Sequence, residues 1–315
     1  MTTQLGGIHH ITAIAGDPQA NIEFYTNVLG LRLVKLTVNY DDPGTYHLYY
    51  GDTAGTPGSI LTFFPFPGAQ PGRPGTGQVT VIAFSIPSDA VGFWAERLAR
   101  KGIEIENSFT RFDEEVLSFR DPDGLPLELV ASKKSDSRQA WNHRSIPIHL
   151  AIRGIYSATI SQAGYESTAR LLTDTMGFRL IRERENRFRY EISSGGASRI
   201  VDVLCLPDGP TQRPGVGTVH HIAWRSSDDQ QHREWRSKIA NLSYNVTPII
   251  DRTYFRSIYF REPGGVLFEI ATDAPGFTVN ESADKLVTRI MLPPWLESRR
   301  KMIEESLPTL RLPGT

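Results

Sequence analysis

The sequence of 315 residues contains almost no cysteine and no long apolar segment. Its single cysteine, Cys205, excludes a disulfide framework and fits a reducing compartment. No apolar run approaches the roughly 18 residues that a membrane span needs. Residues 1–7 also lack the apolar core of a signal peptide. We therefore expect a cytoplasmic protein that has no membrane partner.

The sequence also lacks an excess of charge of either sign. Its formal net charge is -1 at pH 7, from 34 lysines and arginines against 35 aspartates and glutamates. A nearly neutral chain has no general attraction for nucleic acid or for an anionic membrane surface, so we expect neither as a partner. The length is sufficient for two domains that each have their own core.

What the chain does contain is a repeated order of one strand, one helix and three strands. The first unit begins with a short strand from Gly6 and continues with a helix over residues 18–29, which Asp17 caps and Gly30 ends. Its remaining strands are predicted at residues 31–38, 46–50 and 59–66. The same order recurs in three further units, beginning near Val79, Arg153 and Gly215.

The units correspond in alternation. The first and third align without gaps at three pairs of positions: Gly7 with Gly154, Thr12 with Thr159, and Gly30 with Gly177. In the second and fourth, Phe-Arg-Asp-Pro-Asp-Gly before Glu128 matches Phe-Arg-Glu-Pro-Gly-Gly before Glu269. The chain is therefore a duplicated pair of units.

From this duplication we expect two domains of two units each. They cover residues 6–132 and 153–274 and are joined by a polar linker at 133–152. A tail follows at 275–315, with a helix predicted over 294–307.

Four such units, with a histidine on a first strand and a glutamate on a last strand, resemble the vicinal oxygen chelate superfamily. That superfamily contains glyoxalase I, extradiol ring-cleavage dioxygenases and bleomycin-resistance proteins. The resemblance covers about residues 6–273. It implies an α+β fold in which pairs of βαβββ units curl into two half-open mixed β-barrels with the helices outside.

The ligand positions favour one way of pairing the units. The first-strand position holds, in chain order, His10, Val81, Ser157 and His221. Pairing neighbours would give each barrel one histidine and one glutamate. Pairing unit 1 with unit 4 unites His10, His221 and Glu269, and leaves the other barrel with Val81, Ser157 and Glu128. We expect the second pairing; a site shared between the subunits of a homo-oligomer is the alternative.

The resemblance also suggests roles for the neighbours of the metal ligands. Successive side chains of a strand point to opposite faces, so only one histidine of each pair can point at a metal. The resemblance implies that it is the second, because the family's ligand is followed by an apolar and then a small residue, as in His10-Ile-Thr and His221-Ile-Ala. We then expect His9 and Thr12 to contact the substrate and His220 to handle protons. Tyr259 lies ten residues before Glu269, the spacing at which extradiol dioxygenases place an active-site tyrosine.

The position equivalent to Tyr259 in unit 2 holds Ser118. Arg252, which corresponds to Arg111, is expected to stabilise anionic charge in the cavity. Tyr259, His220 and Arg252 are therefore the predicted catalytic residues.

Two histidines and one carboxylate form the facial triad of non-haem Fe(II) oxygenases, and Mn²⁺ suits the same ligands. Isomerases of the glyoxalase type usually add a second carboxylate, where unit 1 offers only Thr62. The segments Gly-Ile-His-His-Ile-Thr, Val-His-His-Ile-Ala and Leu-Pro-Pro-Trp-Leu-Glu resemble the hydroquinone-type ring-cleaving dioxygenases.

We therefore expect an Fe²⁺-dependent enzyme whose partners are O2 and a small para-diol aromatic. Two alternatives stay open. One is a glyoxalase-like, metal-dependent isomerase or lyase, and the other is a non-enzymatic resistance protein that binds an aromatic compound.

Overall fold

All four units contain the order of elements that the sequence predicts. The protein is described by a computed structural model over residues 4–134 and 136–313. The elements of the first two units are β1 (Ile8–Ala15), α1 (Pro18–Glu23), β2 (Arg32–Asn39), β3 (Asp42–Gly51), β4 (Ile60–Pro65), β5 (Gln78–Ile86), α2 (Val91–Arg100), β6 (Ile105–Arg111), β7 (Glu114–Arg120) and β8 (Pro126–Ala131). Those of the last two are β9 (Gly154–Gln162), α3 (Glu166–Arg170), β10 (Arg179–Arg184), β11 (Arg187–Glu191), β12 (Ile200–Cys205), β13 (Thr218–Ser226), α4 (Asp229–Asn241), β14 (Ile250–Asp251), β15 (Arg256–Arg261) and β16 (Leu267–Thr272).

The strands form two mixed sheets of eight strands each, and each sheet takes strands from both halves of the sequence. One has the order β14-β15-β16-β13-β1-β4-β3-β2, which joins units 4 and 1. The other has the order β10-β11-β12-β9-β5-β8-β7-β6, which joins units 3 and 2. The expected fold class and the expected pairing of unit 1 with unit 4 are thus confirmed. The linker at 133–152 contains no helix or strand in its described part.

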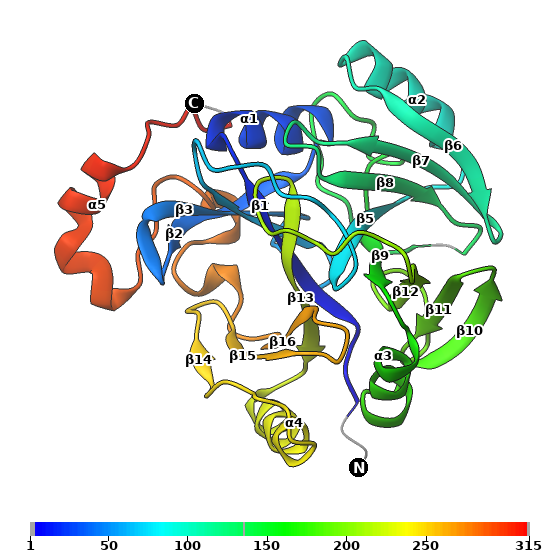
Figure 1. Ribbon diagram of the computed structural model, residues 1–315. Helices are drawn as coiled ribbons and strands as arrows, with labels where there is room; N and C mark the ends of the chain where they lie inside the picture. Colours follow the sequence, from blue (N-terminus) through cyan, green and yellow to red (C-terminus); the bar gives the residue numbers. More distant parts are fainter. Residues whose placement is uncertain (1–3, 135, 314–315) are drawn as a thin grey trace.

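The helices lie outside the two curled sheets (Figure 1). The first helix differs from its prediction, because α1 ends at Glu23 and Phe24–Val28 continues as a π-helical turn before Gly30, whose φ is +69°. Asp17 caps α1 by accepting hydrogen bonds from the backbone N–H groups of Gln19 and Ala20. Among the described residues no helix has the length and apolarity of a membrane crossing.

The hairpin between β2 and β3 is tighter than the sequence indicates. The predicted strands end at residue 38 and resume at residue 46, but β3 already begins at Asp42, which pairs with Asn39. Tyr40 and Asp41 alone form the tip of the hairpin. This tip places Tyr40 and Asp41 at the cavity described below.

The C-terminal tail packs along β2 and β3, and α5 (Arg300–Ser306) lies beside these strands in Figure 1. The predicted helix over 294–307 is split, since Pro294–Arg299 forms a 3-10 helix before α5. Phe277 and Leu286 of the tail belong to a separate buried cluster with Tyr49 and Tyr254. The tail therefore contributes to the core of the first sheet as well as covering its surface.

Candidate metal centre

Three neighbouring strands bring His10, His221 and Glu269 together. His10 lies on β1, His221 on the antiparallel strand β13, and Glu269 on β16, which runs parallel to β13. The Nε2 atoms of the two histidines are 3.3 Å apart, and Oε2 of Glu269 lies 3.2 Å from that of His10 and 2.9 Å from that of His221. All three side chains are buried. In the described part of the chain this is the one group of histidine, cysteine and carboxylate ligands with the spacing of a metal site.

The carboxylate oxygen that faces the histidines has no hydrogen-bond donor. Oε1 of Glu269 accepts a hydrogen bond from the Ser257 hydroxyl, whereas Oε2 is buried without a partner. Ligands that bind a metal at about 2.0–2.2 Å at right angles to one another lie about 3 Å apart. The measured separations match that value, so these residues fit a metal ion that would satisfy the orphaned oxygen.

His9 fixes the tautomer of His10. Nε2 of His9 lies 3.2 Å from the carbonyl oxygen of Thr272, and a carbonyl only accepts, so His9 carries its hydrogen there. Nδ1 of His9 must then accept from Nδ1 of His10, 2.9 Å away. This leaves the lone pair of His10 Nε2 directed at the other two ligand atoms.

The second pair is built in the same way, since Nδ1 of His220 lies 2.7 Å from Nδ1 of His221. Burial lowers the pKa of His221 and that of His220, the latter to about 3, so both imidazoles are neutral. His220 lines the cavity, with its ring against Phe64. His9 does not line it, and the expectation that it contacts the substrate is therefore corrected: its ring is buried behind His10.

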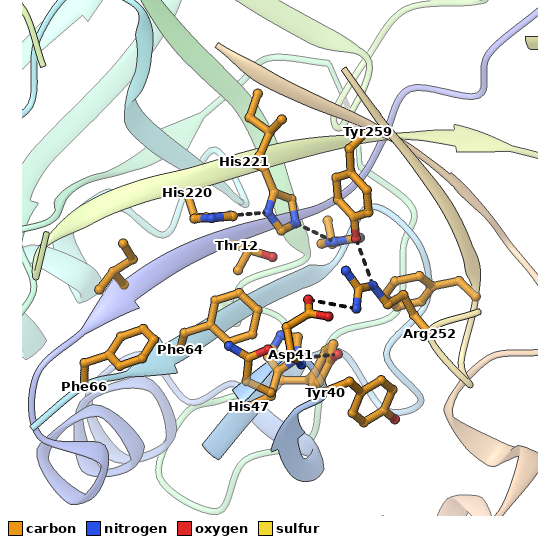
Figure 2. A pocket seen from close by; sticks show the side chains of 16 residues that line it. Thr12, Tyr40, Asp41, His47, Phe64, Phe66, His220, His221, Arg252 and Tyr259 are labelled. Carbon is orange, nitrogen blue, oxygen red and sulfur yellow. Dashed lines mark hydrogen bonds and ion pairs between the residues drawn. The ribbon is translucent and has the colours of Figure 1, made fainter. Parts of the chain in front are cut away.

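A cavity of about 340 Å³ opens in front of the three ligands. Figure 2 shows that its walls come from opposite ends of the sequence, with Phe64, Phe66, Tyr40 and Asp41 of unit 1 facing His220, His221, Arg252 and Tyr259 of unit 4. Most of this wall is aromatic or apolar, and Ile14 and Leu267 add to it. Such a cavity is large enough for one small aromatic ring.

Tyr259 and Arg252 occupy one wall of the cavity. Tyr259 is directly opposite Glu269 in the pairing of β15 with β16, which is how the ten-residue spacing brings the phenol near the ligands. Arg252 donates from Nε to the Tyr259 hydroxyl at 3.3 Å and from Nη1 to Asp41 at 3.1 Å. Burial and the charge of Glu269 raise the pKa of Tyr259, so this hydroxyl keeps its hydrogen.

The opposite wall contains two polar residues that sequence reasoning missed, His47 and Tyr49. Oγ1 of Thr12 is hydrogen-bonded to Oγ1 of Thr62 at 2.8 Å, Thr62 to Nε2 of His47 at 2.9 Å, and Nδ1 of His47 to the Tyr49 hydroxyl at 2.8 Å. Burial lowers the pKa of His47, so its imidazole is a neutral member of this chain. Residues 47 and 49 are two apart on β3, so their side chains lie on one face of the sheet. This alternation could have predicted that both face the cavity.

The equivalent place in the second sheet is filled by ion pairs. Arg111 donates to both carboxylate oxygens of Glu128, at 2.9 and 2.7 Å, and Arg189 binds Asp202 on the other side. Val81 and Ser157 stand where the first sheet has its two histidines. The carboxylate of Glu128 is therefore already bound by an arginine in this barrel.

Comparison with known proteins supports the same fold. Residues 7–129 and 155–270 match the sequence pattern of the Glyoxalase/Bleomycin resistance protein/Dioxygenase superfamily. The chain belongs to this superfamily. MhqO and MhqE of Bacillus subtilis, whose names describe them provisionally as ring-cleaving dioxygenases, are 45% and 44% identical to it over 98% and 96% of this chain and 97% and 99% of their own. The chlorohydroquinone/hydroquinone 1,2-dioxygenase of Sphingobium indicum is 33% identical over 92% of each chain.

Solved structures of the superfamily agree. A crystal structure from Bacillus subtilis, titled provisionally as a dioxygenase, superposes with a TM-score of 0.94 at 43% identity over 98% of both chains. Glyoxalase I from Zea mays superposes with a TM-score of 0.61 at 15% identity, over 85% of this chain and 92% of its own, and so shares the fold.

Proposed function

We propose that the protein is an Fe²⁺-dependent dioxygenase that cleaves the ring of a hydroquinone-like para-diol, with Mn²⁺ as the alternative metal. The observation that carries the proposal is the set of two imidazole nitrogens and one orphaned carboxylate oxygen at the end of an aromatic cavity. Two nitrogens and one oxygen on one side of an ion are the ligands of non-haem iron oxygenases. The names of the relatives support ring cleavage and, in one case, a hydroquinone substrate.

His10, His221 and Glu269 would hold the metal. When bound, iron would supply the redox chemistry by which an aromatic diol reacts with O2. The protein's own contribution is to hold the ring in place, to exclude water and to manage protons. The apolar wall formed by Ile14, Phe64 and Leu267 performs the first two tasks.

Proton handling falls to the polar residues of the cavity. Nδ1 of His220 is engaged with His221, which leaves its Nε2 to meet a substrate hydroxyl. Tyr259, protonated and held by Arg252, can donate to an oxygen that becomes negative, and the guanidinium stabilises that charge. Thr12 lies on the cavity wall, where its hydroxyl can contact the ring hydroxyl.

The contacts of Thr62 weigh against the isomerase alternative. This position would have to supply the second carboxylate of a glyoxalase-type site, but it carries a hydroxyl that is already bound to Thr12 and His47. A non-enzymatic binding protein would have no use for three convergent ligand atoms with an unpaired carboxylate oxygen.

The test is O2 uptake by protein loaded with Fe²⁺ under anaerobic conditions and then offered hydroquinone, methylhydroquinone or catechol. We expect uptake with the para-diols, and loss of both iron and uptake in Glu269→Gln. Glu128→Gln, the same change at the equivalent position of the second sheet, is the matched control and should keep both. Uptake with catechol alone would refute the para-diol assignment. Bound iron without uptake would refute the dioxygenase.

A further inference from the structure

Two arginines at equivalent positions of the two sheets bind different partners. In the second sheet, Arg111 binds both oxygens of Glu128. In the first sheet, Arg252 binds the Tyr259 hydroxyl and Asp41 and makes no hydrogen bond to Glu269. A carboxylate is thus neutralised by arginine in one barrel and left unpaired in the other.

The backbone does not explain this difference. Each arginine stands at the end of a hairpin, and the residue after it has a left-handed conformation, with φ of 53° at Phe112 and 69° at Thr253. The two side chains therefore leave the main chain at the same point of the same turn. Their different partners must result from the side chains around them.

The residue directly across the strand pair from each glutamate does differ. Glu269 faces Tyr259 in the pairing of β15 with β16, and Glu128 faces Ser118 in the pairing of β7 with β8. The phenol ring lies 5.7 Å from the ring of His221 and 5.5 Å from the guanidinium carbon of Arg252. The phenol ring is therefore a neighbour of both His221 and Arg252. A serine side chain is too short to fill the space between them.

We propose that Tyr259 is a positioning residue whose ring keeps Arg252 away from Glu269 and so preserves the carboxylate for the metal. The inference rests on the metal site of the proposed function. It assigns the ring a role separate from that of the hydroxyl, because the hydroxyl accepts a hydrogen bond from Arg252 whereas the volume of the ring blocks the path of Arg252 to Glu269. Without the ring, Arg252 would bind Glu269 as Arg111 binds Glu128.

A second difference between the barrels is Asp202, which occupies the place of Thr62 beside the arginine of the second sheet. Its carboxylate lies 3.8 Å from Nε of Arg111, whereas both oxygens of Glu128 lie within 2.9 Å of the guanidinium. The glutamate is therefore the main partner of Arg111. Asp202 is the more distant acceptor and is itself bound by Arg189.

The experiment is a Mn²⁺ titration under anaerobic conditions, in which the paramagnetic resonance of the free ion gives the dissociation constant. Tyr259→Phe keeps the ring and should bind the metal about as tightly as the wild type. Tyr259→Ser reproduces the second barrel and should bind it about 100-fold more weakly, because the metal must first break a buried arginine–carboxylate pair. Tyr259→Ser combined with Arg252→Ala removes the competing cation and should restore binding. Tyr259→Thr, with a β-branched residue that suits a strand, replaces the serine variant if that one does not fold.

Equal affinity in the wild type and in Tyr259→Ser would overturn the inference. So would a double variant that stays as weak as Tyr259→Ser, because the loss would then not depend on Arg252. A wild-type protein that binds no Mn²⁺ would instead refute the metal site of the proposed function, and the inference with it.

Discussion

Replacing glutamate by glutamine at the two equivalent positions should change stability in opposite directions. In the metal-free protein, Glu269 is a buried carboxylate whose Oε2 has no donor. A glutamine amide could donate to the lone pair of His10 while its oxygen still accepts from Ser257. An unsatisfied buried polar group costs about 1–3 kcal/mol of folding free energy. Metal-free Glu269→Gln should therefore be more stable than the wild type by that amount.

Glu128→Gln should do the reverse. The substitution removes one of the two Glu128 oxygens that accept from the buried Arg111 guanidinium. Breaking a buried ion pair costs about 3–5 kcal/mol of stability. Since the oxygen of glutamine and the more distant Asp202 remain, we expect a loss near the lower end, about 3 kcal/mol.

Urea unfolding with and without Fe²⁺ or Mn²⁺ measures both effects. A metal at about 100 times its dissociation constant adds about 2.7 kcal/mol to a protein that binds it only when folded. This increment should be present in the wild type and in Glu128→Gln, and absent in Glu269→Gln. If metal-free Glu269→Gln were destabilised as strongly as Glu128→Gln, the reasoning that Oε2 of Glu269 lacks a partner in the metal-free protein would be refuted.

Three further outcomes can be measured. Glu281→Gln should cost about 3 kcal/mol in urea unfolding, because it removes the carboxylate that neutralises the fully buried Lys35; a cost below about 1 kcal/mol would contradict this account. Burial raises the pKa of Asp121 to about 6, so between about pH 4 and 6 the unfolded chain releases a proton that the folded chain keeps. The stability of the wild type relative to Asp121→Asn should therefore fall by about 3 kcal/mol as the pH rises through that window, and a flat difference would exclude the shift. Removal of the metal with a chelator should abolish O2 uptake, which Fe²⁺ should restore and Mg²⁺ should not, because imidazole ligands favour iron over magnesium.

Much of the fold and the convergence of His10, His221 and Glu269 could be predicted because they follow from local patterns. Strand periodicity, the Gly30 helix end and the duplicated turns identified the four units. Ligand counting then led to the pairing of β1 with β13, since this pairing alone unites two histidines with Glu269. These features depend on register along a strand, which the sequence specifies directly.

The environment of the ligands was decided only by the tertiary structure. His9 and His10 are adjacent in the chain, and alternation separates their faces, yet their rings share a hydrogen bond because His9 is anchored to the carbonyl of Thr272. The chain from Thr12 through His47 to Tyr49 crosses three strands, and the curl of the sheet turns these side chains toward one cavity.

Arg111 and Arg252 are the clearest example of this division. The sequence determined that they are equivalent, because they occupy the same position in two copies of one unit. Only the folded molecule decided that one binds a glutamate and the other a tyrosine. The physical reason is that a long cationic side chain binds whatever acceptor its neighbours leave within reach, and those neighbours come from other strands.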